Sequence, residues 1–170
     1  MDIYQIDRDG KLFISPDIDD WKPIAERNIT AIFDLEGGID IGIPTIPDRM
    51  LYIYFPFEDR RALPDLQRLH QTAKFGASLI ESGDRVLSHC GMGHNRSALL
   101  AGVILTYLGL TGEQAVALLR QKRQGALYNE VFASYVQSLP SAKGIRECLS
   151  FVNFPIAANK KVRVLESVAQ

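Results

Sequence analysis

Residues 85–108 read RVLSHCGMGHNRSALLAGVILTYL, and this stretch decides the fold expected for the chain. Arg85–Ser88 is predicted to form a short strand, and Asn95–Leu108 is apolar nearly all round, as a central buried helix would be. Gly91 and Gly93 lie in the connecting loop, where glycine permits backbone angles and close contacts that side chains obstruct. A strand, a glycine-containing loop and a buried helix in this order predict an α/β architecture.

The sequence on both sides of this stretch supports that architecture. Upstream, the expected elements are a hairpin of Ile3–Ile6 and Leu12–Ile14, a helix capped by Asp17 or Asp19 that ends near Arg27, strands at Thr30–Leu35 and Met50–Phe57, and a helix from Pro64 to about Glu81. Downstream, the expected helices run from a capping box at Thr111 to about Arg123, and near Glu130–Leu139 and Ala142–Phe151. Strand–helix alternation followed by helices indicates one α/β domain over residues 1–170, with a central, mainly parallel sheet flanked by helices. Residues 160–170 are expected to be either a mobile tail or an edge strand.

The composition excludes several classes of function. The chain is 46% hydrophobic and 23% charged with a net charge of -1, so we expect a monomer that binds neither nucleic acid nor membranes. The longest apolar candidate, Ala98–Leu110, is shorter than the roughly 20 residues that cross a bilayer. The first ten residues contain no apolar core of a secretory signal. The two cysteines, Cys90 and Cys148, form no disulfide scaffold, and the expected compartment is the reducing cytoplasm.

The loop between the strand and the helix has the chemistry of an anion site. Its backbone N–H groups and the N-terminus of the next helix can converge on an oxyanion, and the planar guanidinium of Arg96 can bind two of its oxygens. The same electrostatic field favours the thiolate of Cys90, and the hydroxyl of Ser97 is placed to stabilise that sulfur. His89 is expected to order the loop through hydrogen bonds rather than to transfer protons.

His-Cys, five residues and Arg-Ser, in residues 89–97, resemble the signature of the protein-tyrosine and dual-specificity phosphatase superfamily. The resemblance extends over Tyr52–Leu139 and includes Phe57–Arg60 and GALYNEVFASYVQSL at residues 125–139. It implies a protein-tyrosine-phosphatase-like fold in a small dual-specificity-like member. It also implies a phosphate loop, Cys90–Arg96, in which the residues between the ends bind substrate: Gly91, Met92, Gly93, His94 and Asn95.

Three polar positions within or after this loop are expected to support the site. His94 is expected to face either solvent or substrate. Asn95 is expected to brace the loop through its amide. Asn129 resembles a position near the pocket of related enzymes, and it is equally well placed to cap the helix that Glu130 opens.

The resemblance also implies an aspartate general acid some thirty residues before the cysteine. Asp59 lies 31 residues before Cys90 and follows a predicted strand, so it is our choice. Glu58 and Asp65 remain candidates, although Asp65 also suits the first turn of a helix. Arg60 and its neighbour Arg61 either steer an anionic substrate or are solvated loop residues.

The expected reaction is hydrolysis of a phosphomonoester through a phosphocysteine, with no metal and no cofactor. The expected substrate is a phosphorylated protein, first phosphotyrosine and then phosphoserine or phosphothreonine, because a short chain favours a shallow pocket. The loop contains no lysine, whereas phosphoinositide phosphatases of the superfamily that it resembles often carry a basic residue there; this argues against phosphoinositides, with His94 as the one exception. A small phosphometabolite stays open as a substrate.

Two rival functions use the same loop: a non-catalytic module that binds phosphate, and an enzyme of sulfur or arsenate transfer. The intact set of Cys90, Arg96 and Asp59 argues against the module, and the place of Cys90 in the middle of the chain argues against the transfer enzymes. Cys148 is expected to be a packed helical cysteine, or else a redox partner of Cys90.

Overall fold

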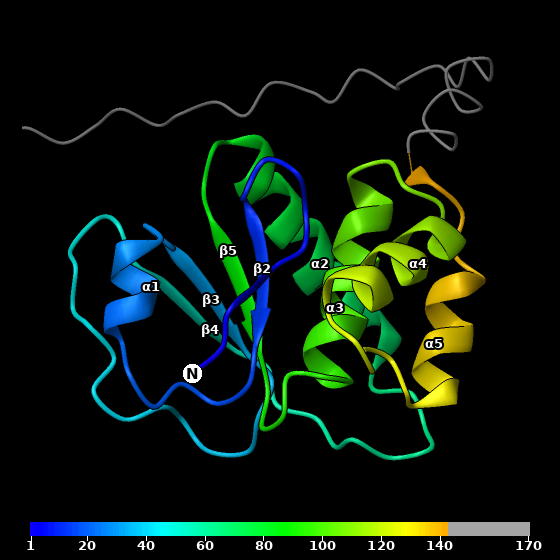
Figure 1. Cartoon of the computed structure of the whole chain (residues 1–170), viewed down its shortest axis with the longest axis horizontal. Coiled ribbons are helices and arrows are strands. Elements are labelled where there is room, and N and C mark those ends of the chain that lie inside the picture. The colour runs from blue at the N-terminus through cyan, green and yellow to red at the C-terminus, as the bar shows by residue number, and fades with distance from the viewer. Residues whose placement is uncertain (143–170) are drawn as a thin grey trace, which may run out of the picture.

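A computed structural model of the chain describes residues 1–142, and its centre is a five-stranded sheet in the order β1-β2-β5-β3-β4 (Figure 1). The strands are β1 (Tyr4–Gln5), β2 (Leu12–Ser15), β3 (Ala31–Asp34), β4 (Leu51–Tyr54) and β5 (Val86–His89). Only β1 runs antiparallel, against β2, while the β2–β5, β5–β3 and β3–β4 pairs are parallel. The mainly parallel sheet expected from the sequence is therefore confirmed.

Helices cover both faces of the sheet, as Figure 1 shows. Among the described helices, the short α1 (Lys22–Glu26) lies on one face, and the other face carries α2 (Leu66–Glu81), α3 (Arg96–Tyr107), α4 (Gly112–Lys122) and α5 (Glu130–Gln137). Buried side chains divide accordingly, because successive residues of a strand point to opposite faces. Leu87 packs in the α1 cluster, whereas Val86 joins the larger core around α3. Sheets buried on both faces require such continuous apolar strands.

The central helix α3 is buried from Ser97 to Thr106, in agreement with its apolar sequence. Two other helix starts were also predicted correctly. The Thr111 side chain accepts a hydrogen bond from the Gln114 amide, and the Gln114 side chain accepts one from the Thr111 amide, which completes the capping box. Asn129 caps α5, with its side-chain oxygen 3.2 Å from the Val131 nitrogen. These local signals succeed because a cap and its helix lie within one turn of sequence.

Two predicted helix starts are wrong. Trp21, not Asp17 or Asp19, stands at the N-cap of α1, and it makes no side-chain capping bond. The helix α2 begins after Asp65 rather than at Pro64, and the Asp65 carboxylate caps it by accepting a hydrogen bond from the Arg68 amide at 2.9 Å. An aspartate cap satisfies a free helical N–H, which a first-turn proline does not.

The aromatic residues of Met50–Phe57 do not all lie in the core. β4 is an edge strand, so Tyr54 is exposed and its hydroxyl accepts a hydrogen bond from the Gly38 amide. The predicted helix at Ala142–Phe151 extends beyond the described residues, and so do Cys148 and the predicted tail at residues 160–170. Within residues 1–142, no helix has the length and hydropathy needed to cross a membrane.

The parallel strands bring four separate loops to one edge of the sheet. Their carboxyl ends lead into the segments that start at Pro16, Leu35, Phe55 and Cys90. In α/β sheets, ligands bind in the crevice at this edge. Cys90 follows the central strand β5, so the other three loops surround it.

Candidate active site

Cys90 is the first residue after β5, and its side chain is almost fully buried at the N-terminal end of α3. Its Sγ atom lies 3.5 Å from Oγ of Ser97, in the first turn of α3. The thiol donates to this hydroxyl, and the hydroxyl donates to the sulfur once the thiol has lost its proton. The pairing expected from the sequence is thus present in the fold.

The phosphate loop is closed by a tight backbone approach at Gly93. This residue has φ +64°, and a Cβ there would lie 2.6 Å from the Pro16 nitrogen and from the Ser15 carbonyl carbon. Both are backbone atoms, which cannot move aside as a flexible side chain can. Glycine is therefore required at this position by conformation and by space.

Arg96 is held by the loops that follow β3 and β4. Nη1 donates to the carbonyl oxygens of Leu35 at 3.2 Å and Phe57 at 3.3 Å, and Nη2 pairs with Glu36. The Nε atom is buried and has no hydrogen-bond partner among the described residues. The Nε–H and the second Nη2–H thus remain for an anion, while the other three N–H groups fix the plane of the group.

Glu36 is a site residue that the sequence analysis missed. Its Oε2 accepts a hydrogen bond from the Gly91 amide at 2.5 Å and also pairs with Nη2 of Arg96. Burial raises the pKa of Glu36, but hydrogen bonds from Arg96 and from the Gly91 and Gly37 amides outweigh it and hold the pKa below its usual value. A charged carboxylate therefore joins the β3 loop to both ends of the phosphate loop.

Asp59 lies beside the phosphate loop and is held by two side-chain amides. Asn95 Nδ2 donates to its Oδ2 at 2.8 Å, and Asn129 Nδ2 donates to its Oδ1 at 2.9 Å. Asn95 also accepts a hydrogen bond from the Asn129 backbone amide at 2.9 Å. The three side chains, which come from three loops, thus form one network, and Asn95 braces the loop as expected.

The two other candidate acids are placed elsewhere. Glu58 pairs with Arg60 at 3.3 Å, and its side chain is 76% exposed. Asp65 is committed to the N-cap of α2. Within the part of the chain that the structure describes, neither of them contacts the phosphate loop through a hydrogen bond, so the geometry favours Asp59.

Arg123, just after α4, braces the phosphate loop from outside. Nε donates to the Gly93 carbonyl at 3.0 Å and Nη2 to the Met92 carbonyl at 3.1 Å. The guanidinium also lies 4.1 Å from the ring centroid of Tyr4. Holding these carbonyls from outside leaves the amides of the loop free to point inward.

Arg123 contacts both His94 and Met92 on the outer side of the phosphate loop, but the two residues differ in exposure. The His94 ring contacts Arg123 at 2.9 Å and stacks at a tilt against Tyr128, and burial followed by the charge of Arg123 lowers its pKa. The Met92 side chain is 66% exposed. Their predicted contacts with substrate stay predictions.

The prediction that His89 orders the loop through hydrogen bonds is wrong. Its ring is fully buried, and neither ring nitrogen has a hydrogen-bond partner among the described residues. Nε2 faces two carboxylates of the β3 side, 3.0 Å from Asp40 Oδ2 and 3.6 Å from Asp34 Oδ1. Burial is the largest influence on the ring and lowers its pKa, against the carboxylates that raise it.

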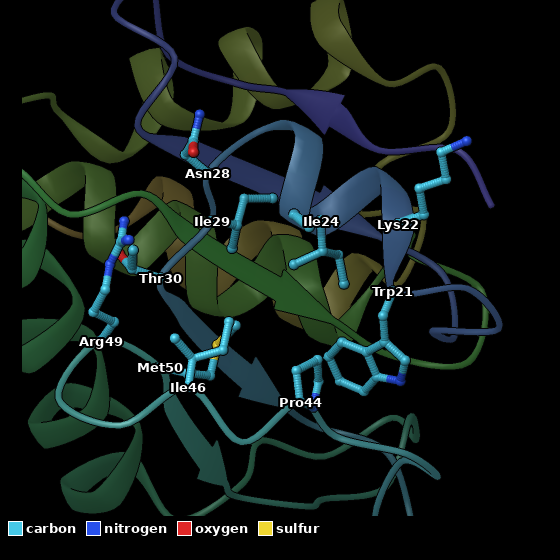
Figure 2. A pocket seen from close by; sticks show the side chains of 11 residues that line it. Trp21, Lys22, Ile24, Asn28, Ile29, Thr30, Pro44, Ile46, Arg49 and Met50 are labelled. Atoms are coloured by element: carbon cyan, nitrogen blue, oxygen red, sulfur yellow. The ribbon is translucent and has the colours of Figure 1, made fainter.

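Two cavities differ in their relation to this site. One of about 580 Å³ opens beside the phosphate loop and is lined by Asp59, Asn95, Asn129 and the exposed Arg60 and Arg61. Another, of about 390 Å³, lies between α1 and the segment before β4 and shares no lining residue with the loop (Figure 2). Figure 2 shows apolar side chains on both of its walls. The first cavity is the one placed to receive the part of a substrate beyond its phosphate.

Comparison with known structures supports the fold. A mouse putative dual specificity phosphatase complexed with zinc tungstate has a TM-score of 0.70 at 19% identity, covering 85% of this chain and 90% of that chain. Human DUSP28 has a TM-score of 0.68 at 19% identity, covering 84% and 95%. PTPMT1 in complex with PI(5)P has a TM-score of 0.67 at 14% identity, covering 86% and 98%.

Sequence comparison identifies the family of the chain but no individual relative. No curated protein matches this chain. The profile of the family described as dual specificity phosphatase, catalytic domain, matches residues 15–139, which include the phosphate loop and all four helices on its side of the sheet. The chain therefore belongs to the dual-specificity phosphatase catalytic-domain family.

Proposed function

We propose that this protein hydrolyses phosphomonoesters through a phosphocysteine intermediate on Cys90, acting on phosphotyrosine and also on phosphoserine or phosphothreonine in proteins. The observation that carries the proposal is the contact between Cys90 Sγ and Ser97 Oγ at 3.5 Å, at the N-terminus of α3. A sulfur in that place meets the positive end of the helix and a hydroxyl donor, which both favour a thiolate.

In the first step, the Cys90 thiolate attacks phosphorus, and an S–P bond forms as the P–O ester bond breaks. The guanidinium of Arg96 and the loop amides hold the equatorial oxygens, so charge is stabilised where it develops. Asp59 gives its proton to the departing oxygen. The side chains of Asn95 and Asn129, which contact both carboxylate oxygens, support this role because they fix the orientation of the acid.

In the second step, the Asp59 carboxylate takes a proton from water, whose oxygen attacks phosphorus. The S–P bond breaks, inorganic phosphate leaves, and Cys90 returns to the thiolate that Ser97 stabilises. Dividing the reaction in this way replaces one difficult displacement with two easier ones. We propose no metal and no cofactor for these steps.

The choice of a protein substrate rests on the surroundings of the loop. The cavity beside Asp59 is open and borders two exposed arginines, Arg60 and Arg61, which suits an extended substrate with acidic residues near the phosphate. A phosphoinositide is the second candidate, suggested by the fold shared with PTPMT1 in complex with PI(5)P. The phosphate loop of this chain carries no lysine, so we place that candidate, and a small phosphometabolite, behind a protein.

We further propose that the protein is monomeric and acts in the cytoplasm.

The deciding experiment measures hydrolysis of para-nitrophenyl phosphate by the wild-type chain and by Cys90→Ser. The serine variant should lose turnover while its circular dichroism stays unchanged, and vanadate should inhibit the wild type without any added thiol. Wild-type turnover in Cys90→Ser would overturn the mechanism. A folded wild type without turnover would instead favour a phosphate-binding module.

A panel of substrates then tests the proposed class. Phosphotyrosine, phosphoserine and phosphothreonine peptides, phosphoinositides and nucleotides are compared at matched concentrations, with Cys90→Ser as the blank. The largest kcat/KM should belong to phosphotyrosine peptides. A larger value for any lipid or nucleotide would contradict the proposed preference while leaving the phosphocysteine chemistry in place.

A further inference from the structure

A second cluster of functional groups lies behind the phosphate loop, on the α1 side of Cys90. It contains Asp34 at the end of β3, Asp40 in the following loop and His89 at the end of β5, and Tyr52 of β4 adjoins it. One ligand atom of each of the first three lies within 4.8 Å of the others. Asp34 and His89 are fully buried, and the Asp40 side chain is 12% exposed.

Hydrogen bonds do not account for the position of the His89 ring. His89 Nε2 lies 3.0 Å from Asp40 Oδ2 and 3.6 Å from Asp34 Oδ1, yet it forms no hydrogen bond with either. The N–H direction at Nε2 is therefore aligned with neither oxygen. Within residues 1–142 this fully buried imidazole has no hydrogen-bond partner, which is costly because buried polar groups in native structures are nearly always satisfied. The ring is aimed into the cluster without being bonded to it.

The two carboxylates of the cluster also have few hydrogen-bond donors around them. The Tyr52 hydroxyl lies 2.6 Å from Asp34 Oδ2 and 2.9 Å from Asp40 Oδ2, but it has one proton and can donate to only one of them. Apart from the Glu36 backbone amide, which donates to Asp34 Oδ1, the two carboxylates share this one hydroxyl as their hydrogen-bond donor among the described residues. Buried charges are normally paired or coordinate a metal ion.

We propose that Asp34, Asp40 and His89 bind a divalent metal ion, with Zn²⁺ the best fit. Zinc takes imidazole nitrogen and carboxylate oxygen at about 2.0–2.2 Å in tetrahedral geometry, which sets neighbouring ligand atoms about 3.4 Å apart. The separations of Nε2 from the two carboxylate oxygens, 3.0 Å and 3.6 Å, lie on either side of that value. A cation between these atoms would use Nε2, one of the two ring nitrogens without a hydrogen-bond partner among the described residues, and would balance the two carboxylates.

The ion has an entry path. Asp40 lines a cavity of about 490 Å³ that also contains the carboxylates of Asp17, Asp19 and Glu36. Four carboxylates around one opening attract cations and repel anionic substrates. The metal would therefore reach its site from the side of the β3 loop, while a phosphate enters above Cys90.

The site is separate from the reacting atoms but connected to them. Asp34 Oδ1 accepts a hydrogen bond from the Glu36 amide at 2.9 Å, and the Glu36 side chain in turn contacts Arg96. His89 directly precedes Cys90. A bound ion would thus fix the β3 loop and the end of β5 together, as a structural metal does. The proposal does not depend on the proposed function, because it concerns a different set of ligands.

Cobalt binding to the full chain tests the proposal. The Cys90→Ser variant is used so that the active-site thiolate cannot act as a ligand, and the protein is first treated with a chelator. Titration with Co²⁺ should give the intense visible absorption of a tetrahedral site, saturate at one ion per chain, and disappear when Zn²⁺ is added. Zn²⁺ should also raise the melting temperature in a concentration-dependent way.

Single substitutions identify the ligands. In the same background, Asp40→Asn and Asp34→Asn should each weaken Co²⁺ binding by about 10-fold or more. Asp19→Asn is the matched control from the same cavity, since Asp19 is 72% exposed and lies outside the cluster. Circular dichroism of the metal-free variants checks that each is folded. Absence of the tetrahedral spectrum in Cys90→Ser, or its retention in folded Asp40→Asn and Asp34→Asn, overturns the proposal.

Discussion

Asn95 donates its side-chain amide to the Asp59 carboxylate across 2.8 Å, and this bond joins the phosphate loop to the loop that follows β4. The two residues are 36 positions apart in the sequence. Asn95 stands at the N-cap of α3, and its side chain makes no capping bond there but contacts Asp59, so the residue that opens the central helix also orients the acid. The bond thus links the acid to the loop that holds the nucleophile.

The first prediction concerns the general acid itself. Asp59→Asn should lower kcat by about 10²–10⁴-fold for alkyl phosphates, which need a proton on the leaving oxygen, and by less for aryl phosphates with acidic phenols. A series of leaving groups measures this difference. Glu58→Gln is the control and should match the wild type, because Glu58 lies in solvent. A strong effect confined to Glu58 or Asp65 variants would contradict the assignment.

Asn129 has two roles that substitutions can separate. Asn129→Ala removes both the N-cap of α5 and the amide that contacts Asp59, so it should cost about 1 kcal/mol of folding free energy and also lower kcat. Asn129→Ser keeps a capping oxygen but cannot supply the amide, so stability should recover while kcat stays low, by up to about 100-fold. Urea unfolding and steady-state kinetics check the pair. Full activity in folded Asn129→Ser would show that the amide is dispensable.

Glu36 should make stability depend on pH. Its pKa in the folded protein lies below the ordinary 4.5, so the charged carboxylate stabilises the fold above that value, and the contribution is lost as the pH falls through the folded pKa. The stability difference between wild type and Glu36→Gln should thus be full at pH 7 and shrink steadily below about pH 5. Urea unfolding at a series of pH values measures it.

The same variant should also lose activity, by about 10- to 100-fold, because Arg96 loses a charged partner that fixes its plane. The loss should appear in kcat/KM at pH 7, where the fold is intact. A difference in stability that does not vary with pH, together with unchanged kinetics, would show that the Glu36 charge has no role.

Gly93 should tolerate no side chain. Gly93→Ala places a methyl group 2.6 Å from backbone atoms of Ser15 and Pro16 at a positive φ, so it should cost at least about 1 kcal/mol and abolish turnover. Gly37→Ala is the matched control, because nothing lies within 4 Å of its added Cβ, and it should change stability by no more than about 0.5 kcal/mol. Thermal melts and turnover of both variants provide the comparison, and a fully active Gly93→Ala would refute the steric argument.

The sequence by itself determined the features that depend on near neighbours. The Cys90–Arg96 loop, the strand before it, the buried helix after it and the capping box at Thr111 are all encoded within one or two turns of chain. Their chemistry follows from residue type and spacing, because a cap, a nest of amides and a helix N-terminus form between adjacent residues. Two predicted helix starts, at Pro64 and at Asp17 or Asp19, are wrong. At Pro64 the neighbouring Asp65 supplies the cap, and α1 begins after Trp21 with no side-chain cap at all.

Only the tertiary structure decided which distant groups meet the loop. Glu36 lies 55 positions from Gly91, and Asp59 lies 70 positions from Asn129, yet both pairs are hydrogen-bonded. The order β2-β5-β3-β4 places those segments at one sheet edge, and strand order depends on packing summed over both faces. No local sequence pattern contains this sum of packing contributions. The partners of Arg96 and the cluster around His89 therefore follow from the tertiary structure and not from the local sequence.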